Sequence, residues 1–486
     1  MDRAAALQPI VARDTAFANW ARTFRCTPLA IFDPTTKDDV RRVLALARAE
    51  GRPVRAVGVG HSPSDLACTS GYMVRMAGLK RVLEIDPQKL IVRAEGGITL
   101  AALHAALAAH GLAMRNVGSI SDQTLAGMVT TATHGTGIGH CVLSTDVLAA
   151  QLLLADGTTV RCTPDQNEAL FAATLCGLGS TGIILDLTLR VVPAFRLRET
   201  QRTLPFDAVV GNLDAIVHSA EFVRMWWWPQ AGAIRTSAMD RTVEVRRPSS
   251  PPCTCVLVLM AVLQERRPAS SWLWHSLIGY HLLQFLLFVG LFLPSFNLWV
   301  GRFTAWLVRD DTVAVDNSLD IFNIDCKYRQ HTTEWAIPYA QAQACLQVLR
   351  TWFDEEFANP AGLRPHCALE IRFSAADDVW LSPCYAQETC WIGVVQYKPY
   401  GLNVPYRALF REFERIVASH GGRPHWAKAH RLRPQELVNL YPRFNAFRDL
   451  LQEVDPNGVL RNEYVERHVF GREGPMWGDR VFKARA

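Results

Sequence analysis

A histidine stands at the tip of a glycine-rich segment near the beginning of the chain, RAVGVGHSPSD at residues 55–65. Gly58 and Gly60 leave no side chain between the backbone and a ligand, and glycine adopts positive φ angles easily. Successive exposed amides in such a turn form a concave anion site, which suits a diphosphate. The segment therefore predicts a cofactor-binding loop that presents His61, although a strand-ending turn with a solvated histidine would use the same residues.

A second segment, NVGSISDQTLAGMVTTATHGTGIG at residues 116–139, is rich in Gly, Ser and Thr. Small residues let a flat ring system approach the backbone, and hydroxyl groups donate hydrogen bonds to phosphate or ring heteroatoms. A loop that leads into a short buried helix is the alternative. The G-x-G-x-x-G match GLGSTG, at residues 177–182, precedes a strand-like run instead of opening a helix, so it lacks the dinucleotide-binding context.

Two charged motifs lie in the second half of the chain. LEIRF places Glu370 and Arg372 two residues apart on a predicted strand, so both side chains point to one face and could polarise a hydroxyl group. An ordinary ion pair is the competing interpretation. HWAKAH offers Lys428 between His425 and His430, whose spacing is poor for a metal pair on one helix face. We therefore expect no metal.

The composition limits the class of protein. The chain has 486 residues, which predicts two domains or more. The net charge of +5 is small for this length and forms no basic block, which argues against a nucleic-acid partner. The 12 cysteines show no paired metal spacing and are expected to be reduced. The N-terminus carries acids and lacks an apolar stretch long enough for a cleavable signal peptide.

The elements that must position these residues are helices and short strands in mixed order. A helix is expected from a cap at Thr36 to Gly51, and a second helix before Gly111. A hairpin is expected with its turn at Asp156 and Gly157. The strands are not separated by regularly alternating helices, so the pattern indicates an α+β domain and not a doubly wound sheet.

An apolar tract at residues 272–308 is the most unusual part of the composition. A membrane-spanning helix needs about 20 predominantly apolar residues. Polar residues interrupt the tract and Pro294 ends its first part, while several Trp and Tyr residues suit the membrane interface. Two helices in the membrane surface, or a shallow hairpin, therefore fit better than one span. A buried helical hairpin is the alternative.

The segments VGVGHSPSD, GSISDQTLAGMVTTATHGTG, LGSTGIIL, LEIRF and GGRPHWAKAH, in this order, resemble the vanillyl-alcohol-oxidase flavoprotein family. Within it the chain resembles the aldonolactone oxidase branch, most closely the animal-type L-gulonolactone oxidases, over nearly its whole length. The resemblance implies an α+β, two-domain FAD-binding fold of the PCMH/VAO type. It implies an FAD-binding domain at 17–193, a substrate-binding cap domain at 194–465 and a tail at 466–486 that returns to the FAD domain.

The resemblance also implies how FAD is held. It points to a covalent bond between His61 and the 8α carbon of the flavin, with His134 as the rival attachment site. The implied FAD-binding residues are Gly58, Val59, Gly60, His61, Ser62, Gly118, Ser121, Thr124, Gly127, Thr133, His134, Gly135, Gly182 and Ile183.

The implied catalytic residues are Glu370, Arg372, Lys428 and Ser119, with Gln396 as a weaker substrate contact. The implied reaction is oxidation of an aldono-1,4-lactone, L-gulono-1,4-lactone, at C2. A hydride passes to flavin N5, O₂ is reduced to H₂O₂, and L-ascorbate forms. Oxidation of D-arabinono-1,4-lactone, and a dehydrogenase that uses another electron acceptor, remain alternatives. The alternative from a different class of protein is not an enzyme but a membrane-docking protein with vestigial flavin loops.

Two further expectations rest on the resemblance. Gly118 stands where related plant dehydrogenases carry a bulkier residue that shields the flavin, so a path for oxygen is expected here. The animal enzymes carry a similar apolar tract and are microsomal, so association with the endoplasmic reticulum membrane is expected. The expected partners are the small lactone, O₂ and the membrane, and the oligomeric state is left open.

Overall fold

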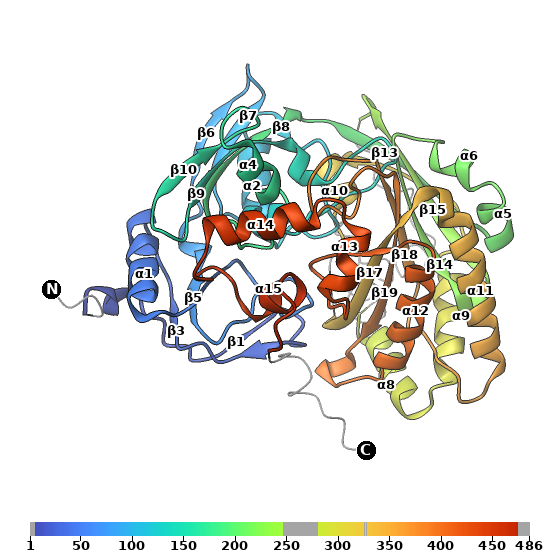
Figure 1. Cartoon of the computed structure of the whole chain (residues 1–486). Helices are drawn as coiled ribbons and strands as arrows, with labels where there is room; N and C mark the ends of the chain where they lie inside the picture. The colour runs from blue at the N-terminus through green and yellow to red at the C-terminus, as the bar shows by residue number, and fades with distance from the viewer. Residues whose placement is uncertain (1–4, 246–279, 325, 327, 475–486) are drawn as a thin grey trace.

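The computed structural model describes residues 5–245, 280–324, 326 and 328–474 (Figure 1). The N-terminal half of the chain forms one side of the molecule, and a large sheet with its covering helices forms the other side. A short 3-10 helix, η1 (Ala5–Ile10), precedes the first strands.

The first part of the N-terminal half is a small parallel sheet in the order β3-β5-β4, packed against helix α1. These elements are β3 (Ala30–Phe32), α1 (Lys37–Glu50), β4 (Val54–Val57) and β5 (Tyr72–Arg75). The side chain of Thr36 accepts a hydrogen bond from the Asp39 amide, and Gly51 ends α1 with a φ of 62°. These two caps confirm the limits predicted for this helix.

The second part of the N-terminal half is a five-stranded antiparallel sheet in the order β10-β9-β11-β7-β6. Its strands are β6 (Val82–Asp86), β7 (Ile91–Glu95), β9 (Val147–Leu153), β10 (Thr159–Cys162) and β11 (Ile183–Arg190). Strands β9 and β10 form the predicted hairpin, with Gly157 at a φ of 91°. Helices α2 (Leu100–Ala108), α3 (Leu125–Thr130) and α4 (Glu168–Thr174) accompany this sheet. The first of them ends three residues before the predicted stop at Gly111.

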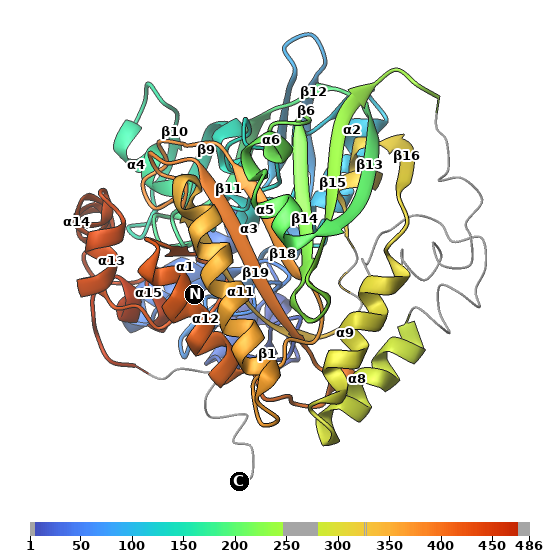
Figure 2. The ribbon, with the colours of Figure 1, turned by 90° about the vertical axis from the view of Figure 1, so that its right-hand side faces the viewer.

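The eight-stranded sheet dominates the other half, in the order β16-β13-β15-β14-β18-β19-β17-β20. Its strands are β13 (Arg196–Pro205), β14 (Phe222–Trp228), β15 (Ala233–Thr242), β16 (Thr312–Asn317), β17 (Gln330–Pro338), β18 (Leu369–Ser374), β19 (Thr389–Tyr397) and β20 (Arg423–Pro424). Helices α5 (Phe206–Val210), α6 (Leu213–Val217), α11 (Ala342–Ala358) and α12 (Arg407–Ser419) cover one face and share a hydrophobic core with it (Figure 2). The opposite face turns toward the N-terminal half (Figure 1).

Short elements connect these sheets: β1 (Phe17–Ala18), β2 (Arg25–Cys26), β8 (Leu112–Ala113), β12 (Val192–Pro193) and α10 (Ser318–Phe322). The C-terminal helices are α13 (Pro434–Leu440), α14 (Phe444–Val454) and α15 (Glu463–His468). They return to the N-terminal half, where the Val54 amide donates to the Val459 carbonyl and Arg467 forms an ion pair with Asp65. The return thus begins before residue 466, and residues 475–486 lie outside the described part.

The described part of the apolar tract forms two helices, α8 (Leu283–Phe292) and α9 (Phe296–Leu307), which contact each other after a break at Pro294 (Figure 2). Residues 272–279 of the tract lie outside the described residues. Within the described ranges, no helix combines the length and the apolar character that crossing a membrane requires.

Candidate active site

A long cavity lies where the two glycine-rich segments meet strands β17 and β18 and the loop after β20. Its lining includes most of the predicted FAD-binding residues: Gly58, Val59, Gly60, His61, Ser62, Gly118, Thr124, Gly127, Thr133 and His134. Its lining also includes Ser119, Arg372 and Lys428 from the predicted catalytic set. The fold thus brings segments more than 300 residues apart in the sequence into one site.

The first glycine-rich segment needs its glycines for steric reasons. A Cβ atom at Gly58 would collide with the side chain of Thr124, and Gly60 adopts a φ of +68°. His61 stacks on Trp20 with 4.8 Å between the ring centroids. Burial, followed by the positive charge of Lys428, lowers the pKa of His61 to about 4. The imidazole is therefore neutral near pH 7 and keeps a lone pair for nucleophilic attack.

The second glycine-rich segment is held by Asn116, whose side-chain amide donates to the Thr136 carbonyl over 2.9 Å. A Cβ atom at Gly135 would collide with that asparagine, so this glycine serves the packing of the loop and does not line the cavity. Ser121 also points elsewhere, because its hydroxyl donates to Asn323 Oδ1 over 2.7 Å. The segment therefore divides between cavity-lining and loop-supporting residues.

Arg55 is a cavity residue that the sequence interpretation missed, although it opens the first segment. The side chain is buried, and burial lowers its pKa to about 10. One guanidinium nitrogen donates to the carbonyl of Gly179 over 3.2 Å, while Nε has no hydrogen-bond partner among the described residues. The loop at residues 177–182 thus supports Arg55, whereas Gly182 and Ile183 of the predicted set do not line the cavity.

A second, smaller cavity adjoins the first. It is bounded by Trp226 and Trp228 of β14, by Glu370 of β18 and by residues of β17 and β19. Five residues line both cavities, namely Ser119, Ile120, Glu334, Arg372 and Lys428. The boundary between the cavities is therefore where a ring in the first could meet a small molecule in the second.

One row of residues across four strands builds the floor of the second cavity. The strand register pairs Glu334 with Gly393, Gly393 with Glu370, and Glu370 with Trp226. Directly paired residues point to the same face of a sheet. Gly393 contributes no side chain, so the row leaves an open space between the two carboxylates.

Arg372 and Glu370 form a bidentate ion pair, with Nε 2.8 Å and Nη2 2.6 Å from the two carboxylate oxygens. Ser119 Oγ lies 3.5 Å from the same carboxylate. Burial alone would lower the pKa of Arg372, but the charges of Glu370 and Glu334 outweigh it and raise the pKa. The guanidinium is therefore a permanent positive charge, fixed in orientation at the boundary of the two cavities.

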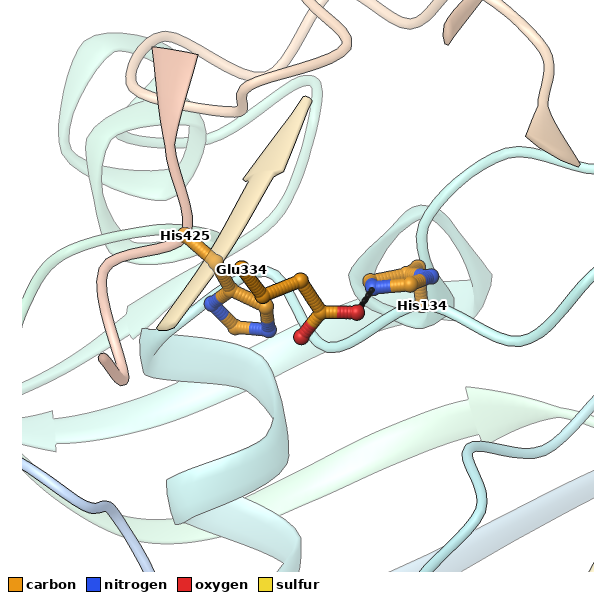
Figure 3. Close-up of side chains that lie close together, drawn as sticks. All are labelled: His134, Glu334 and His425. Atoms are coloured by element: carbon orange, nitrogen blue, oxygen red, sulfur yellow. Dashed lines mark ion pairs between the residues drawn. The ribbon is translucent and has the colours of Figure 1, made fainter. Parts of the chain in front are cut away.

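Glu334 connects two predicted site residues and was missed by the sequence interpretation. Its carboxylate lies 3.3 Å from His134 Nε2 (Figure 3). The same carboxylate lies 3.3 Å from Lys428 Nζ. Burial alone would raise the pKa of Glu334, but Lys428 and His134 hold it well below its usual value. His134 is further fixed by stacking on Trp391, with 3.7 Å between the ring centroids. The carboxylate thus neutralises and orients Lys428.

His134, Glu334 and His425 place one potential ligand atom each within 4.8 Å of one another, a spacing that could hold a metal ion. The positive charge beside this carboxylate is already supplied by Lys428. Burial lowers the pKa of both histidines, most strongly at His425, so they are neutral. We interpret this group as the electrostatic support of Lys428, and the absence of a metal stays a prediction.

Comparison with known proteins identifies the family. Residues 187–468 match the family described as D-arabinono-1,4-lactone oxidase, and residues 28–163 match an FAD-binding domain. L-gulonolactone oxidase of Scyliorhinus torazame is 39% identical over 455 residues, covering 93% of this chain and 98% of that protein. L-gulonolactone oxidase of Mus musculus is 38% identical, covering 93% and 97%. The chain belongs to the aldonolactone oxidase family.

The fold of this aldonolactone oxidase family member agrees with a solved structure. Cholesterol oxidase from B. sterolicum superimposes with a TM-score of 0.77 at 16% identity, covering 94% of this chain and 97% of that one. Together with the FAD-binding domain match at residues 28–163, this confirms the predicted α+β FAD-binding fold of the PCMH/VAO type. The domain limits at residues 193 and 465 stay predictions.

The cavity of this family member fits FAD. The collision at Gly58 shows that its glycine is required by the packing around the cavity. The orphaned Nε of Arg55 offers a buried donor for an anionic ligand. Hydroxyl groups of Thr124 and Thr133 line the same cavity. Close backbone approach, a buried cation and hydroxyl donors together match a diphosphate-linked ring cofactor.

Gln396 is the predicted substrate contact that the fold places elsewhere. It pairs with His331 across the sheet, on the face opposite to the cavity floor. Its side chain donates to the carbonyl of Arg364 over 2.9 Å and accepts from the amide of His366 over 3.2 Å. Gln396 therefore links β19 to the preceding loop and lines neither cavity.

Proposed function

We propose that this flavoprotein oxidises L-gulono-1,4-lactone at C2, with FAD covalently attached to His61 and O₂ as the electron acceptor. The products are H₂O₂ and a 2-keto lactone, which tautomerises to L-ascorbate. The observation that carries the proposal is the meeting of the two cavities at Arg372 and Lys428. Two cations, each fixed by a carboxylate, lie where the lactone would contact the flavin.

Bound FAD supplies the acceptor for the hydride that leaves C2. The chain stabilises the charge that develops on the substrate oxygen as its hydroxyl proton departs. Arg372 is oriented by Glu370, and Lys428 is held by Glu334, so neither cation must reorganise during the reaction. The tryptophans of β14 give the lactone cavity an apolar wall. Such a wall excludes water and strengthens the interaction of both cations with the oxygen.

The proposed link at His61 is supported by the state of its imidazole. A neutral ring is the nucleophilic form, and the pKa of about 4 keeps it neutral near pH 7. His61 lines the cavity and is only partly buried. His134, in contrast, is fully engaged with Glu334 and Trp391. This difference favours His61 over its rival.

Oxygen uptake with purified holoprotein tests the activity. L-gulono-1,4-lactone should consume O₂, with one H₂O₂ released and one ascorbate formed for each O₂. Higher kcat/KM with D-arabinono-1,4-lactone would assign that lactone as the substrate. Lactone-dependent dye reduction without O₂ uptake would replace the oxidase by a dehydrogenase. No turnover with either lactone would refute the proposal.

Glu334→Gln should impair catalysis without removing the flavin. The substitution removes the counter-charge of Lys428, which then loses its fixed position. We expect the anaerobic rate of flavin reduction to fall about 10- to 100-fold, as for other residues that orient an active-site group. Its pH profile should also change, because the charge beside Lys428 is gone. Glu199→Gln is a matched control, because Glu199 is buried, pairs with Arg224 and lines neither cavity. An unchanged rate and pH profile in Glu334→Gln would refute the orienting role.

Gly118→Ala should slow the reaction with oxygen selectively. An added Cβ would lie 3.1 Å from Cγ2 of Thr133 and 3.3 Å from the His134 carbonyl, so alanine fits after a small shift. We expect reoxidation by O₂ to slow about tenfold, or about 1.4 kcal/mol of barrier. Anaerobic reduction by lactone should be largely unchanged. Gly139→Ala is the control, because its Cβ meets open space. Equal oxygen rates in Gly118→Ala and wild type would refute the proposed oxygen path.

The proposal extends to location at the endoplasmic reticulum membrane. Helices α8 and α9 expose large apolar side chains, which together with two residues near η7 (Pro399–Gly401) we call the apolar hairpin surface: Leu282, Phe285, Phe292, Leu293, Trp299, Trp306, Tyr400 and Leu402. Phe288 contacts Tyr400, which joins the helices to that loop. Burial and the charges of three arginines lower the pKa of the adjacent, buried Lys398 to about 8, and two of these arginines, Arg22 and Arg25, are exposed. Apolar side chains beside a cationic rim suit insertion into an anionic membrane surface.

Replacing both Trp299 and Trp306 by serine should weaken membrane binding. Each side chain is about half exposed, at 50% and 51%, so the change removes apolar contact without opening the core. We expect binding to phosphatidylcholine–phosphatidylserine vesicles to weaken about tenfold or more, since membrane affinity scales with inserted apolar area. Val348→Ser is the control, because Val348 is 44% exposed on α11. A wild-type protein that stays unbound in vesicle flotation and leaves microsomes without detergent would refute the membrane proposal.

A further inference from the structure

A third cavity, of about 340 Å³, lies beside the active site on the α12 side of β17. It shares Pro63 with the lining of the flavin cavity and Thr332 with that of the lactone cavity. Its walls come from α12, β17, α15 and the segment 429–433. This volume is at the lower end of the range for small-molecule sites. The proposed lactone oxidation assigns no role to it.

The lining of this cavity is strongly basic. One carboxylate, Glu414, lines it together with eight basic side chains: Arg407, Arg411, Arg431, Arg433, Arg467, His331, His430 and His468. Within the described ranges, no carboxylate forms an ion pair with Arg411, Arg431 or Arg433. Glu414 accepts a hydrogen bond from Thr333, and burial raises its pKa to about 7. Arg467 is already paired with Asp65, so Glu414 is a weak counter-charge for the other arginines of the lining.

Three buried groups in the lining lack hydrogen-bond partners among the described residues. They are His331 Nε2, His430 Nδ1 and Arg467 Nη1, and their side chains are 5%, 3% and 2% exposed. Buried polar groups in proteins are almost always satisfied, so three orphans around one cavity call for a ligand or ordered water. The Tyr464 hydroxyl donates to the Trp426 carbonyl, so the neutral His430 ring donates to Tyr464 through Nε2 and leaves Nδ1 as an acceptor. Arg467 Nη1 is a donor, and His331 Nε2 is one in the tautomer that carries its proton there, so an anion is a suitable partner for these two groups, and a protonated phosphate oxygen or a water would serve His430.

We propose that this cavity binds a small multivalent oxyanion, with phosphate or carboxylate groups, and that its occupancy alters lactone oxidation. Arginine guanidinium groups recognise such oxygens by charge-assisted hydrogen bonds. The pKa values of His331 and His430 fall to about 3, through burial and then through nearby cations. Both imidazoles are therefore neutral near pH 7, and the positive charge that an anion would offset is that of the lining arginines.

Two elements connect this cavity to the active site. Strand β17 carries His331 in the anion cavity and Glu334 at the boundary of the other two cavities. The segment after β20 carries Lys428 in the active site and His430 two residues later in the anion cavity. A shift of either element on anion binding would move the ion pair between Glu334 and Lys428.

Titration calorimetry of the holoprotein with inorganic phosphate and with citrate, against chloride at equal ionic strength, tests the binding. The variant Arg411→Gln/Arg431→Gln changes two exposed residues, so the fold should persist. We expect its affinity for the anions to fall about tenfold or more, or about 1.4 kcal/mol. Arg415→Gln is the matched control, because Arg415 lies on the same helix, pairs with Glu412 and does not line the cavity. It should bind like wild type.

The outcomes separate the parts of the proposal. No binding of phosphate or citrate beyond chloride, or equal binding by the double variant and wild type, would overturn the site. Binding that leaves KM and kcat for the lactone unchanged would overturn the link to catalysis. Vesicles containing phosphatidylglycerol distinguish the source of the anion. A lipid headgroup is the ligand if phosphate competes with vesicle binding and the double variant binds the vesicles about tenfold more weakly than wild type. If either result is absent while phosphate or citrate binds, the ligand is a soluble anion.

Discussion

Replacing Arg372 by alanine should slow lactone oxidation severely while the protein keeps its flavin, which we propose to be covalently bound. Arg372 lines both cavities. Its guanidinium group forms a bidentate ion pair with the Glu370 carboxylate. A preorganised charge aimed at a developing oxyanion supplies stabilisation that the ground state lacks. Losing such a group typically costs a factor of about 100 to 1000 in kcat. Anaerobic flavin reduction by L-gulono-1,4-lactone measures this loss, and flavin in the acid-precipitated pellet measures retention of the cofactor.

Two controls separate catalysis from folding. Arg372→Lys keeps a positive charge but loses the bidentate geometry, so it should recover only part of the rate. Arg224→Ala removes a buried, ion-paired arginine from the neighbouring strand, where the register sets it opposite Arg372. It should lower thermal stability, and because Arg224 itself lines neither cavity, the reduction rate of folded protein should fall much less than in Arg372→Ala. A near-normal rate in Arg372→Ala would show that the pair with Glu370 is only structural.

Replacing His61 by alanine should release the flavin from the chain without emptying the cavity. The remaining lining still offers backbone amides, threonine hydroxyls and Arg55. We therefore expect non-covalent, reducible flavin in the folded variant and a colourless pellet after acid precipitation. Turnover should fall, because an 8α-histidyl link favours reduction of the flavin.

The variant His134→Ala tests whether His134, and not His61, carries the covalent flavin. His134 supports Glu334 and packs on Trp391, so its loss should slow flavin reduction but leave the pellet yellow. Covalent flavin that persists in His61→Ala and disappears in His134→Ala would reassign the attachment site. Covalent flavin lost in both variants would indicate that attachment depends on a correctly formed cavity, and it would leave His61 without unique support.

Local requirements made much of this fold predictable. The caps of α1 at Thr36 and Gly51 act within a few residues, so a sequence pattern is sufficient to find them. The glycine-rich segments are recognisable for the same reason, because steric demands at Gly58 and Gly60 are met only by glycine. These are the segments that line the FAD cavity.

Residues whose position depends on strand register could not be predicted. Glu334 reaches Lys428 because β17 lies between β19 and β20, an order that the sequence does not show. Gln396 lies on β19, which is buried along nearly its whole length, so polar–apolar alternation gives no indication of which face meets the cavity. Arg55 contacts the loop at 177–182, and nothing within the segment 55–65 shows that this distant loop accepts a hydrogen bond from its guanidinium group.

Anaerobic mixing of the holoprotein with L-gulono-1,4-lactone tests the central claim most directly. The oxidised flavin spectrum should bleach at a rate that saturates with the lactone concentration. Admitting O₂ should then restore the spectrum with one H₂O₂ per flavin. A flavin that stays oxidised in the presence of both L-gulono- and D-arabinono-1,4-lactone would contradict the proposed function, because the boundary between the two cavities would then serve another reaction.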